Sequence, residues 1–167
     1  GAQLVYQFKQ EQQSDWWEVE ALYDLCFAPG REALSSYRLR DQVAPVVDLS
    51  MVARDPDGIL GGAIRYWPIV VGCHNALLLG PVAVHPTRQG EGLGGALIRD
   101  SLVLAARQGW RRALLVGDAP YYRRYGFEKL NDVVMPPPTN PDRVLGLSII
   151  PDAWLGVCGP VQSARDR

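Results

Sequence analysis

The sequence has few of the residues and segments that several protein classes require. Its three cysteines are far apart, odd in number and without a CxxC pair, which excludes a disulfide framework and a cysteine-rich zinc module. No apolar run approaches the roughly 20 residues that cross a bilayer, and the start lacks a basic segment followed by an apolar one. We therefore expect neither a membrane span nor a signal peptide, and we expect the cysteines to be buried as small apolar residues.

Charge of one sign is not in excess either. Seventeen Lys and Arg residues face 18 Asp and Glu residues, a formal charge of −1. Proteins that bind phosphate backbones or anionic membranes normally carry surplus basic charge, so we expect no nucleic-acid and no membrane partner. At 167 residues and 47% hydrophobic content, the chain predicts one globular domain over residues 1–167. We expect a cytoplasmic location, and a homodimer is compatible with the composition.

Hydrophobic spacing predicts a mixed α/β order. Apolar residues recur at helical spacing in the segments after Ser14-Asp15 and after Gly94, and an Asp57-Gly58 turn between two apolar runs predicts a hairpin. We expect helices at 16–27 (ended by Pro29-Gly30), 32–40, 94–107 and 121–125, and strands at 49–53, 59–67, 76–84, 113–116 and 144–150. The strands at 76–84 and 113–116 flank a helix, so they should be parallel neighbours.

The most informative local pattern is a glycine-rich turn, Gln89-Gly90-Glu91-Gly92-Leu93-Gly94-Gly95, between an expected strand and an expected helix. Glycines let a backbone approach a bulky anion and aim several N–H groups at it. The first helical turn adds free N–H groups and the positive end of the helix dipole. The pattern therefore predicts a phosphate site, although glycines that only shape a turn are an alternative interpretation.

A dinucleotide-binding fingerprint is a further interpretation of this turn, because Gly90, Gly92 and Gly95 match GxGxxG. In that fingerprint the first glycine follows the strand directly. Here residues 85–89 intervene, and too little chain follows for the remaining strands. No Gly-Lys-Ser/Thr closes the turn, so it is not a Walker loop.

Two motifs in order resemble the GNAT superfamily of acetyl-CoA-dependent N-acetyltransferases. The first is Leu78-Leu79-Gly80-Pro81-Val82-Ala83-Val84-His85-Pro86 followed by Gln89-x-x-Gly92-x-Gly94, and the second is Tyr121-Tyr122-Arg123-Arg124-Tyr125-Gly126-Phe127. The resemblance covers about residues 46–130. It implies an α/β (α+β) fold with a mixed, mostly antiparallel sheet, whose central parallel strand pair is splayed at a bulge and flanked by helices.

The resemblance also implies a cofactor, acetyl-CoA, with CoA as product and no metal. It implies that an acetyl or short acyl group passes directly to a primary amine of a small-molecule or peptide acceptor. Tyr122 matches the family's general acid. The implied cofactor-binding residues are Val82, Ala83, Val84, Gln89, Gly90, Glu91, Gly92, Leu93, Gly94 and Gly95. A non-catalytic CoA-binding or regulatory module of the same fold is the alternative.

The base that deprotonates the acceptor is not evident, because the strand at 76–84 contains no acid. Asp118 and a water chain are the candidates, and we expect His85 to be a loop residue and His74 to lie beside a turn. Further side chains have both a structural and a functional interpretation. Arginines 88, 123 and 124 are solvated surface or phosphate ligands, and the aromatic residues Trp16, Trp17, Tyr23 and Phe27 are core, which we favour, or acceptor pocket wall.

Overall fold

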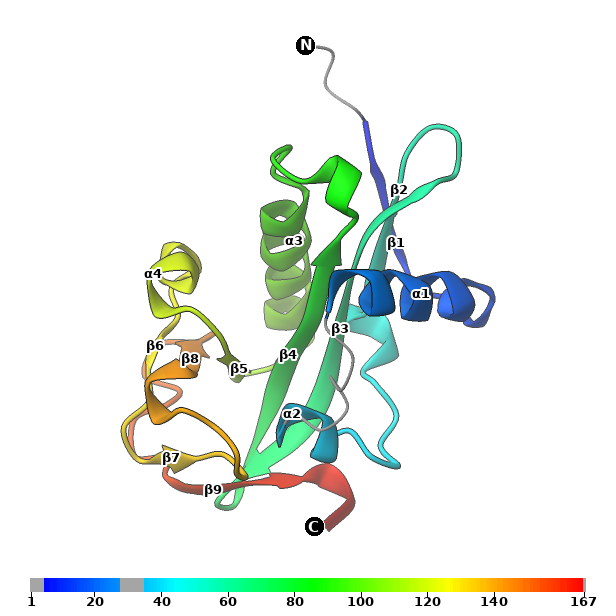
Figure 1. The fold of residues 1–167 in the computed structure, drawn as a ribbon. Helices are drawn as coiled ribbons and strands as arrows, with labels where there is room; N and C mark the ends of the chain where they lie inside the picture. The colour runs from blue at the N-terminus through cyan, green and yellow to red at the C-terminus, as the bar shows by residue number, and fades with distance from the viewer. Residues whose placement is uncertain (1–4, 28–34, 167) are drawn as a thin grey trace.

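The computed structural model describes residues 5–27 and 35–166, so Pro29-Gly30 and the start of the expected helix 32–40 lie outside the described residues. A sheet runs in the order β1-β2-β3-β4-β5-β8-β6, and β9 joins it through β3 and carries β7 (Figure 1). The strands are β1 Gln7–Gln10, β2 Met51–Arg54, β3 Leu60–Val71, β4 His74–Val84, β5 Arg112–Val116, β6 Glu128–Lys129, β7 Val133–Val134, β8 Val144–Ser148 and β9 Gly159–Ser163.

Most neighbouring strands are antiparallel. The β2–β3 hairpin closes through the expected turn, where Gly58 takes a φ of 82° that suits glycine. β4 and β5 are parallel, with Leu77 opposite Ala113 and Leu78 opposite Leu114. The expected mixed, mostly antiparallel sheet with a central parallel pair is therefore confirmed.

The parallel pairing ends early because β4 is interrupted. The β3–β4 register shifts between Ile64 and Tyr66, which leaves Gly80 and Pro81 opposite the single residue Arg65. Two long side chains hold this bulge. The indole Nε1 of Trp67 donates to the Gly80 carbonyl at 2.8 Å, and the Tyr23 hydroxyl donates to the Pro81 carbonyl at 3.0 Å. Beyond the bulge β4 stays paired with β3 up to Val84 but no longer pairs with β5. The expected splay of the parallel pair is therefore present.

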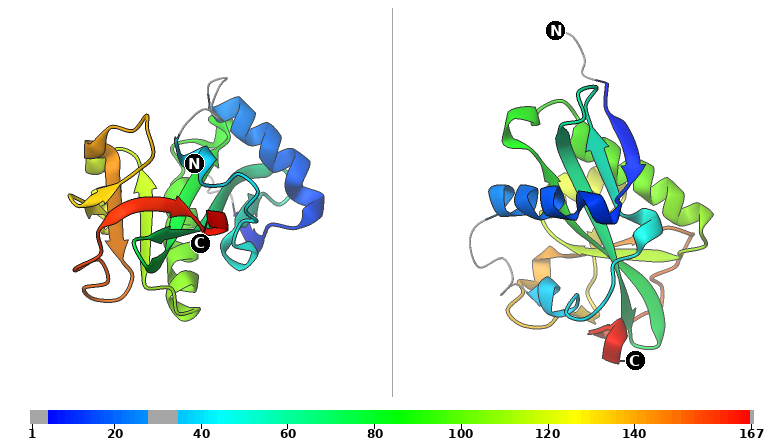
Figure 2. Two further views of the ribbon diagram at one scale, coloured as in Figure 1. Left: turned by 90° about the horizontal axis from the view of Figure 1, so that it is seen from below. Right: turned by 90° about the vertical axis from the view of Figure 1, so that its right-hand side faces the viewer.

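Helices cover both faces of the sheet. The long helices are α1 (Trp16–Cys26) and α3 (Leu93–Arg107), and the short ones are α2 (Ser35–Arg38) and α4 (Ala119–Tyr122). α1 and α3 lie on opposite faces of β3 and β4 (Figure 2). Side chains alternate along a strand, so Ile64 packs with Leu97 of α3, whereas Ala63 packs with Val19 of α1.

The main differences from expectation lie at the sheet margins. β1, β6, β7 and β9 were not expected; they are two to five residues long, and some of their residues are exposed. Residues 136–141, four of which are prolines, form a surface connection between β7 and β8. In the part of the chain that the structure describes, no helix has the length and apolarity to cross a membrane.

Candidate functional site

The glycine turn joins the end of β4 to α3. Gly90 and Gly92 have φ values of 87° and 79°, a left-handed conformation in which side chains are strained, and nothing lies within 4 Å of a Cβ built on either residue. Gly92 is the N-cap of α3 and offers no side chain to the first helical N–H groups. These donors face a cavity of about 600 Å³, which we call the glycine-turn cavity. An anionic ligand would complete their hydrogen bonding.

The last residues of β4 present backbone groups on the side that β5 has left. The His85 N–H donates to the Gly61 carbonyl at 2.8 Å, so His85 and Gly61 form a hydrogen-bonded pair that continues the β3–β4 ladder. Pairing alternates along an antiparallel ladder. Val82 and Val84 therefore direct their N–H and C=O groups away from β3, whereas Ala83 directs its groups toward Ala63. The Val84 carbonyl already accepts from the Gln89 side chain at 3.3 Å.

Tyr122 ends α4 and faces the splayed end of β4. Its ring packs edge-on against Tyr121 and Phe127, with centroids 4.9 and 6.1 Å away. The backbone behind it must be glycine, because a Cβ at Gly117 would lie 2.6 Å from Tyr122 Cε2. Within the described residues its hydroxyl takes no part in a hydrogen bond. The ring is thus fixed while the hydroxyl stays available.

The environment of Tyr122 keeps this hydroxyl protonated. Burial raises the pKa of Tyr122 above its usual 10, and the nearby Tyr125 and Asp118 raise it further, while Arg143 opposes them. A neutral hydroxyl near pH 7 can donate a proton to a group that gains negative charge.

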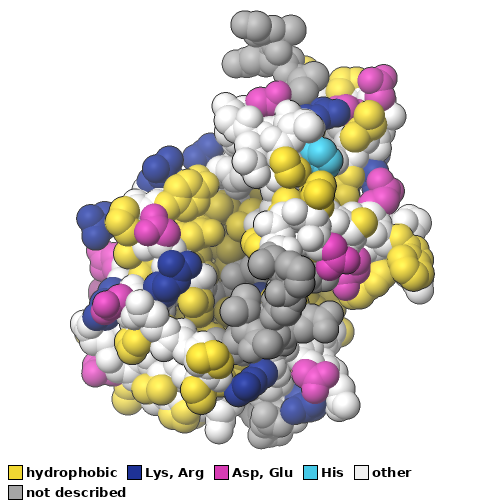
Figure 3. All heavy atoms as spheres, in the orientation of Figure 1, with side chains coloured by type: hydrophobic (Ala, Val, Ile, Leu, Met, Phe, Trp, Pro, Cys, Tyr) yellow, Lys and Arg dark blue, Asp and Glu magenta, His cyan; other side chains and the backbone are white. Residues whose placement is uncertain are grey.

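Two cavities meet at Tyr122. It lines the glycine-turn cavity and also a cavity of about 160 Å³ between the diverging ends of β4 and β5, which we call the splay cavity. Hydrophobic side chains line a hollow between α4 and β4, with basic side chains near its rim (Figure 3). The splay cavity is lined by Phe27, Tyr37, Arg40, Leu78, Leu79, Gly80, Pro81, Val82, Leu115, Val116 and Tyr122.

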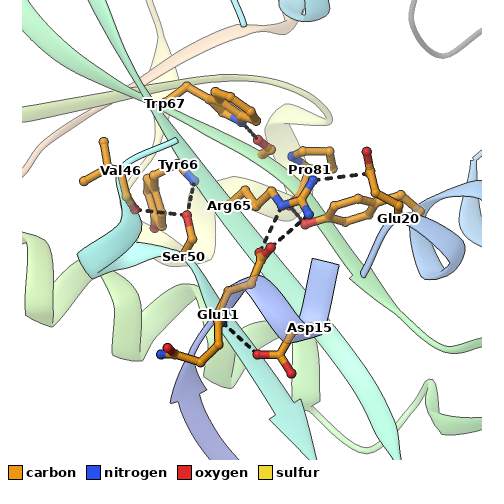
Figure 4. A network of polar contacts seen from close by, with 12 residues as sticks. Glu11, Asp15, Glu20, Val46, Ser50, Arg65, Tyr66, Trp67 and Pro81 are labelled. Atoms are coloured by element: carbon orange, nitrogen blue, oxygen red, sulfur yellow. Dashed lines mark hydrogen bonds and ion pairs between the residues drawn. The ribbon is translucent and has the colours of Figure 1, made fainter. Parts of the chain in front are cut away.

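A third cavity, of about 670 Å³, opens beside α1 on the other side of the bulge, and we call it the α1 cavity. One wall is an ion-pair network around Arg65 (Figure 4). Arg65 Nε and Nη2 donate to the Glu11 carboxylate at 3.0 and 2.9 Å, and Nη1 lies 3.3 Å from Glu20. Its guanidinium also lies 4.2 Å from the Trp16 ring. This network fixes charged groups at the mouth of a pocket that also touches Pro81 of the bulge.

Comparisons with known proteins decide the family. Residues 48–129 match the model of an acetyltransferase (GNAT) domain. The protein superposes on a GNAT family acetyltransferase from Brucella melitensis, solved in complex with acetyl-CoA, with a TM-score of 0.73 and 30% identity. The match covers 95% of each chain. The chain belongs to the GNAT family.

Two further relatives of this GNAT protein, both from Escherichia coli, are named as uncharacterised N-acetyltransferases. The structure of the GNAT family N-acetyltransferase YhbS from Escherichia coli in complex with CoA matches with a TM-score of 0.84 and 25% identity, over 100% of this chain and 95% of that one. In sequence, YhbS is 29% identical over 66% of each protein. YjhQ of Escherichia coli is 43% identical over 30% of this chain. The sequence matches thus span 66% of YhbS and 28% of YjhQ.

The structure brings most of the predicted site residues together. Val82, Val84, Gln89, Gly90, Gly92, Leu93, Gly94, Gly95 and Tyr122 line the glycine-turn cavity. Two side chains of the turn point elsewhere. Glu91 accepts from the Tyr6 hydroxyl at 2.9 Å, and the Leu93 side chain is buried in the core. Ala83 is buried against α1. The binding roles of these residues stay predictions.

Several other candidate residues have side chains with structural roles or surface positions. The Asp118 carboxylate accepts from the Tyr121 N–H at 3.2 Å as the cap of α4. His85 Nδ1 lies 2.8 Å from the Thr87 hydroxyl in the loop after β4, and His74 is the exposed first residue of β4, beside the β3–β4 turn, so both lie where they were expected. Arg88 pairs with Asp55 at 3.0 Å while lining the glycine-turn cavity.

The aromatic and cysteine expectations are partly wrong. Tyr23 is core, as favoured, but Trp17 is 82% exposed. Trp16 lines the α1 cavity and Phe27 lines the splay cavity, so both fit the alternative role of pocket wall. Cys73 and Cys158 are also exposed, because Cys73 lies in the β3–β4 turn and Cys158 lies in the irregular segment before β9.

Sequence reasoning missed three residues of the site. Arg99 lines the glycine-turn cavity, and its position one α3 turn beyond Gly95 could have indicated this. Gly117 leaves space for the Tyr122 ring, and a glycine directly after the apolar run at 113–116 was a usable signal. Arg40 lines both the α1 cavity and the splay cavity, and no local pattern marks it.

Proposed function

We propose that this chain, acting as one domain, transfers an acetyl or short acyl group from acetyl-CoA to a primary amine of a small-molecule or peptide acceptor. The observation that carries the proposal is the position of Tyr122. Its unpaired hydroxyl stands where the glycine-turn cavity meets the splay cavity. A cofactor with a diphosphate at one end and a reactive thioester at the other would span this junction. Family membership supports the same activity.

The glycine-turn cavity fits the diphosphate of CoA. Gly90 and Gly92 leave open space where a Cβ would stand, and the 15-residue helix α3 begins at that point. Arg99 and Arg124 line the cavity and add positive charge. Backbone N–H donors, helix dipole and guanidinium groups each favour a phosphate.

The splayed end of β4 fits the pantetheine arm. An extended chain with amide groups can add to a strand whose edge is unpaired. Val82 and Val84 direct backbone groups to that edge, because β5 pairs only with the part of β4 before the bulge. Acetyl-CoA, when bound, supplies an activated acetyl group and a thiolate leaving group.

The chain's own residues then handle charge and protons. A backbone N–H on the open side of β4 stabilises the negative charge that develops on the acetyl oxygen. Tyr122, kept protonated by burial, donates its proton to the departing sulfur. The acceptor must lose a proton, since an alkylammonium with a pKa near 10.4 is not nucleophilic. Because Asp118 caps α4, we assign that proton to water in the open α1 cavity.

The same proposal includes the absence of nucleic-acid and membrane partners and a cytoplasmic location. The near-zero net charge supports the first two. Because acetyl-CoA is a metabolite of the cell interior, an enzyme that consumes it belongs there.

Replacing Tyr122 with Phe tests the proposal. We expect kcat, measured as thiol release from acetyl-CoA over a panel of primary amines, to fall by about 10²–10⁴-fold because the proton donor is lost. The Kd for CoA should stay unchanged. Tyr66→Phe is the matched control, since it removes the same atom from a buried tyrosine away from the three cavities. Full turnover in Tyr122→Phe would refute the general-acid role. Acetyl-CoA binding by the native chain without thiol release from any amine would instead favour the non-catalytic module.

A further inference from the structure

Arg40 is a buried guanidinium that the proposed chemistry does not use. It lies just after α2 and lines both the splay cavity and the α1 cavity. Its Cζ stands 4.2 Å from the Tyr37 ring centroid and 5.5 Å from that of Trp67. Among the buried side-chain atoms of the described residues, its Nε and Nη1 are the ones without a hydrogen-bond partner. Burial lowers the pKa of Arg40 to about 10, which leaves it a cation near pH 7.

The neighbouring cations of the α1 cavity are already engaged. Arg65 is paired with Glu11 and Glu20, and Arg165 lies 3.4 Å from Asp41. Arg38 donates to the Pro137 carbonyl at 2.9 Å. Arg40 has no ion pair with any described carboxylate.

The lining of the α1 cavity is also basic overall. Four guanidinium groups stand against two carboxylates, those of Glu20 and Asp41. Arg40 shares a side-chain hydrogen bond with Tyr37, but its Nε and Nη1 have no acceptor. A buried cation without a charged partner is costly, and a site with surplus positive charge favours an anionic occupant. The missing acceptors of Arg40 would be supplied by a ligand that enters this cavity.

We propose that the acceptor carries a carboxylate beside its primary amine, and that Arg40 binds this carboxylate. The inference rests on the proposed function and names its substrate class, an amino-acid-like amine. Arg40 stands where the α1 cavity passes into the splay cavity. A carboxylate held there would place the attached amine at the entrance to the space assigned to the acetyl group. Arg40 is then a residue that determines acceptor specificity.

The cofactor does not supply this anion. The diphosphate of acetyl-CoA belongs at the glycine turn, and Arg40 is not among the residues that line that cavity. The groups of the pantetheine arm that would pass Arg40 are neutral amides. The carboxylate must therefore arrive with the acceptor, through the α1 cavity.

The test compares α-, β- and γ-amino acids with their carboxamides, as matched pairs that differ in the carboxylate. Two measurements are made: thiol release with acetyl-CoA, and calorimetric binding of each compound to the CoA-loaded protein. In the native chain the amino acid should be the better member of at least one pair. Arg40→Gln should lower its kcat/KM and its affinity by about 10- to 100-fold, the loss typical of a hydrogen bond to a charged group. The values for the carboxamide should not change.

Arg40→Lys should restore part of the preference, since it returns the charge without the planar fork. Arg107→Gln, at an exposed position of α3 outside the three cavities, should behave as the native chain. Equal use and equal binding of both members of every pair overturn the inference, as does an Arg40→Gln variant that weakens both equally. Amino acids that bind through Arg40 without thiol release support the site and refute the transferase. Turnover of amines without a preference for a carboxylate supports the transferase and refutes the Arg40 site.

Discussion

Gly117→Ala tests the geometry that places Tyr122, the proposed general acid. Gly117 follows β5, and its φ lies outside the left-handed region, so alanine introduces no backbone strain. The new Cβ would stand 2.6 Å from Tyr122 Cε2 and 3.0 Å from Leu115 Cδ1. Ordinary contact begins near 3.4 Å, so the Tyr122 ring must retreat by about 0.8 Å. The Tyr122 ring is rigid, so its hydroxyl is displaced with it. The neighbouring rings of Tyr121 and Phe127 pack against it and would be disturbed by the same movement.

The expected loss follows from this displacement. A misplacement of about 1 Å in a catalytic group costs about 10²-fold in rate. We expect kcat to fall by that factor, and overpacking to lower the free energy of unfolding by about 1–3 kcal/mol. The Kd for CoA should be unchanged, because Gly117 does not line the glycine-turn cavity.

A double-mutant cycle with Tyr122→Phe separates displacement of the hydroxyl from general damage. Thiol release gives kcat, calorimetry gives the Kd for CoA, and urea denaturation gives the free energy of unfolding. If Gly117 acts through the Tyr122 hydroxyl, adding Gly117→Ala to Tyr122→Phe should lower kcat no further. Additive losses in kcat, or full activity in Gly117→Ala, would refute the reasoning.

Three more predictions concern the fold, the glycine turn and the pH dependence. Tyr66→Phe removes a buried 2.8 Å hydrogen bond to Ser101, so urea denaturation should show a loss of about 1 kcal/mol with activity retained. Gly92→Val places a branched side chain at a φ of 79° in open cavity space, so the Kd for CoA should rise at least tenfold by calorimetry; unchanged affinity would contradict the phosphate site. Since burial raises the pKa of Tyr122, the acid form persists to higher pH, and kcat should show no decline assignable to Tyr122 below about pH 10. A decline near pH 8 that Tyr122→Phe abolishes would contradict this.

The central fold could be predicted because local and long-range signals agree there. Asp57-Gly58 marks a turn that the backbone needs, and the run at 113–116 is apolar on both faces, as a buried parallel strand must be. The marginal strands carry no such signal. β6 and β7 have two residues each, and their pairing is decided by β8 and β9, which lie elsewhere in the sequence.

The site divides in the same way. The glycine turn is local, so its position between a strand and a helix could be predicted from the glycine pattern, while its binding residues were implied by the family resemblance. Trp16 and Tyr23 share one helix, yet one lines a cavity and the other is fully buried, because β4 passes beneath only part of α1. Arg40 depends on α2, the bulge and Trp67 coming together, and no segment of sequence contains all three.

The bulge in β4 fixes the point at which β4 and β5 diverge. Trp67 and Tyr23 hold the Gly80 and Pro81 carbonyls, so β4 leaves β5 at a fixed point. The splay cavity shares Val82 and Tyr122 with the glycine-turn cavity, and it shares Arg40 and Pro81 with the α1 cavity. If the glycine turn binds the cofactor and Arg40 binds the acceptor, as proposed, the two substrates would approach this small space from opposite sides of β4. We therefore expect the acetyl group to lie in that space, where both proposed anchors and the Tyr122 hydroxyl can reach it.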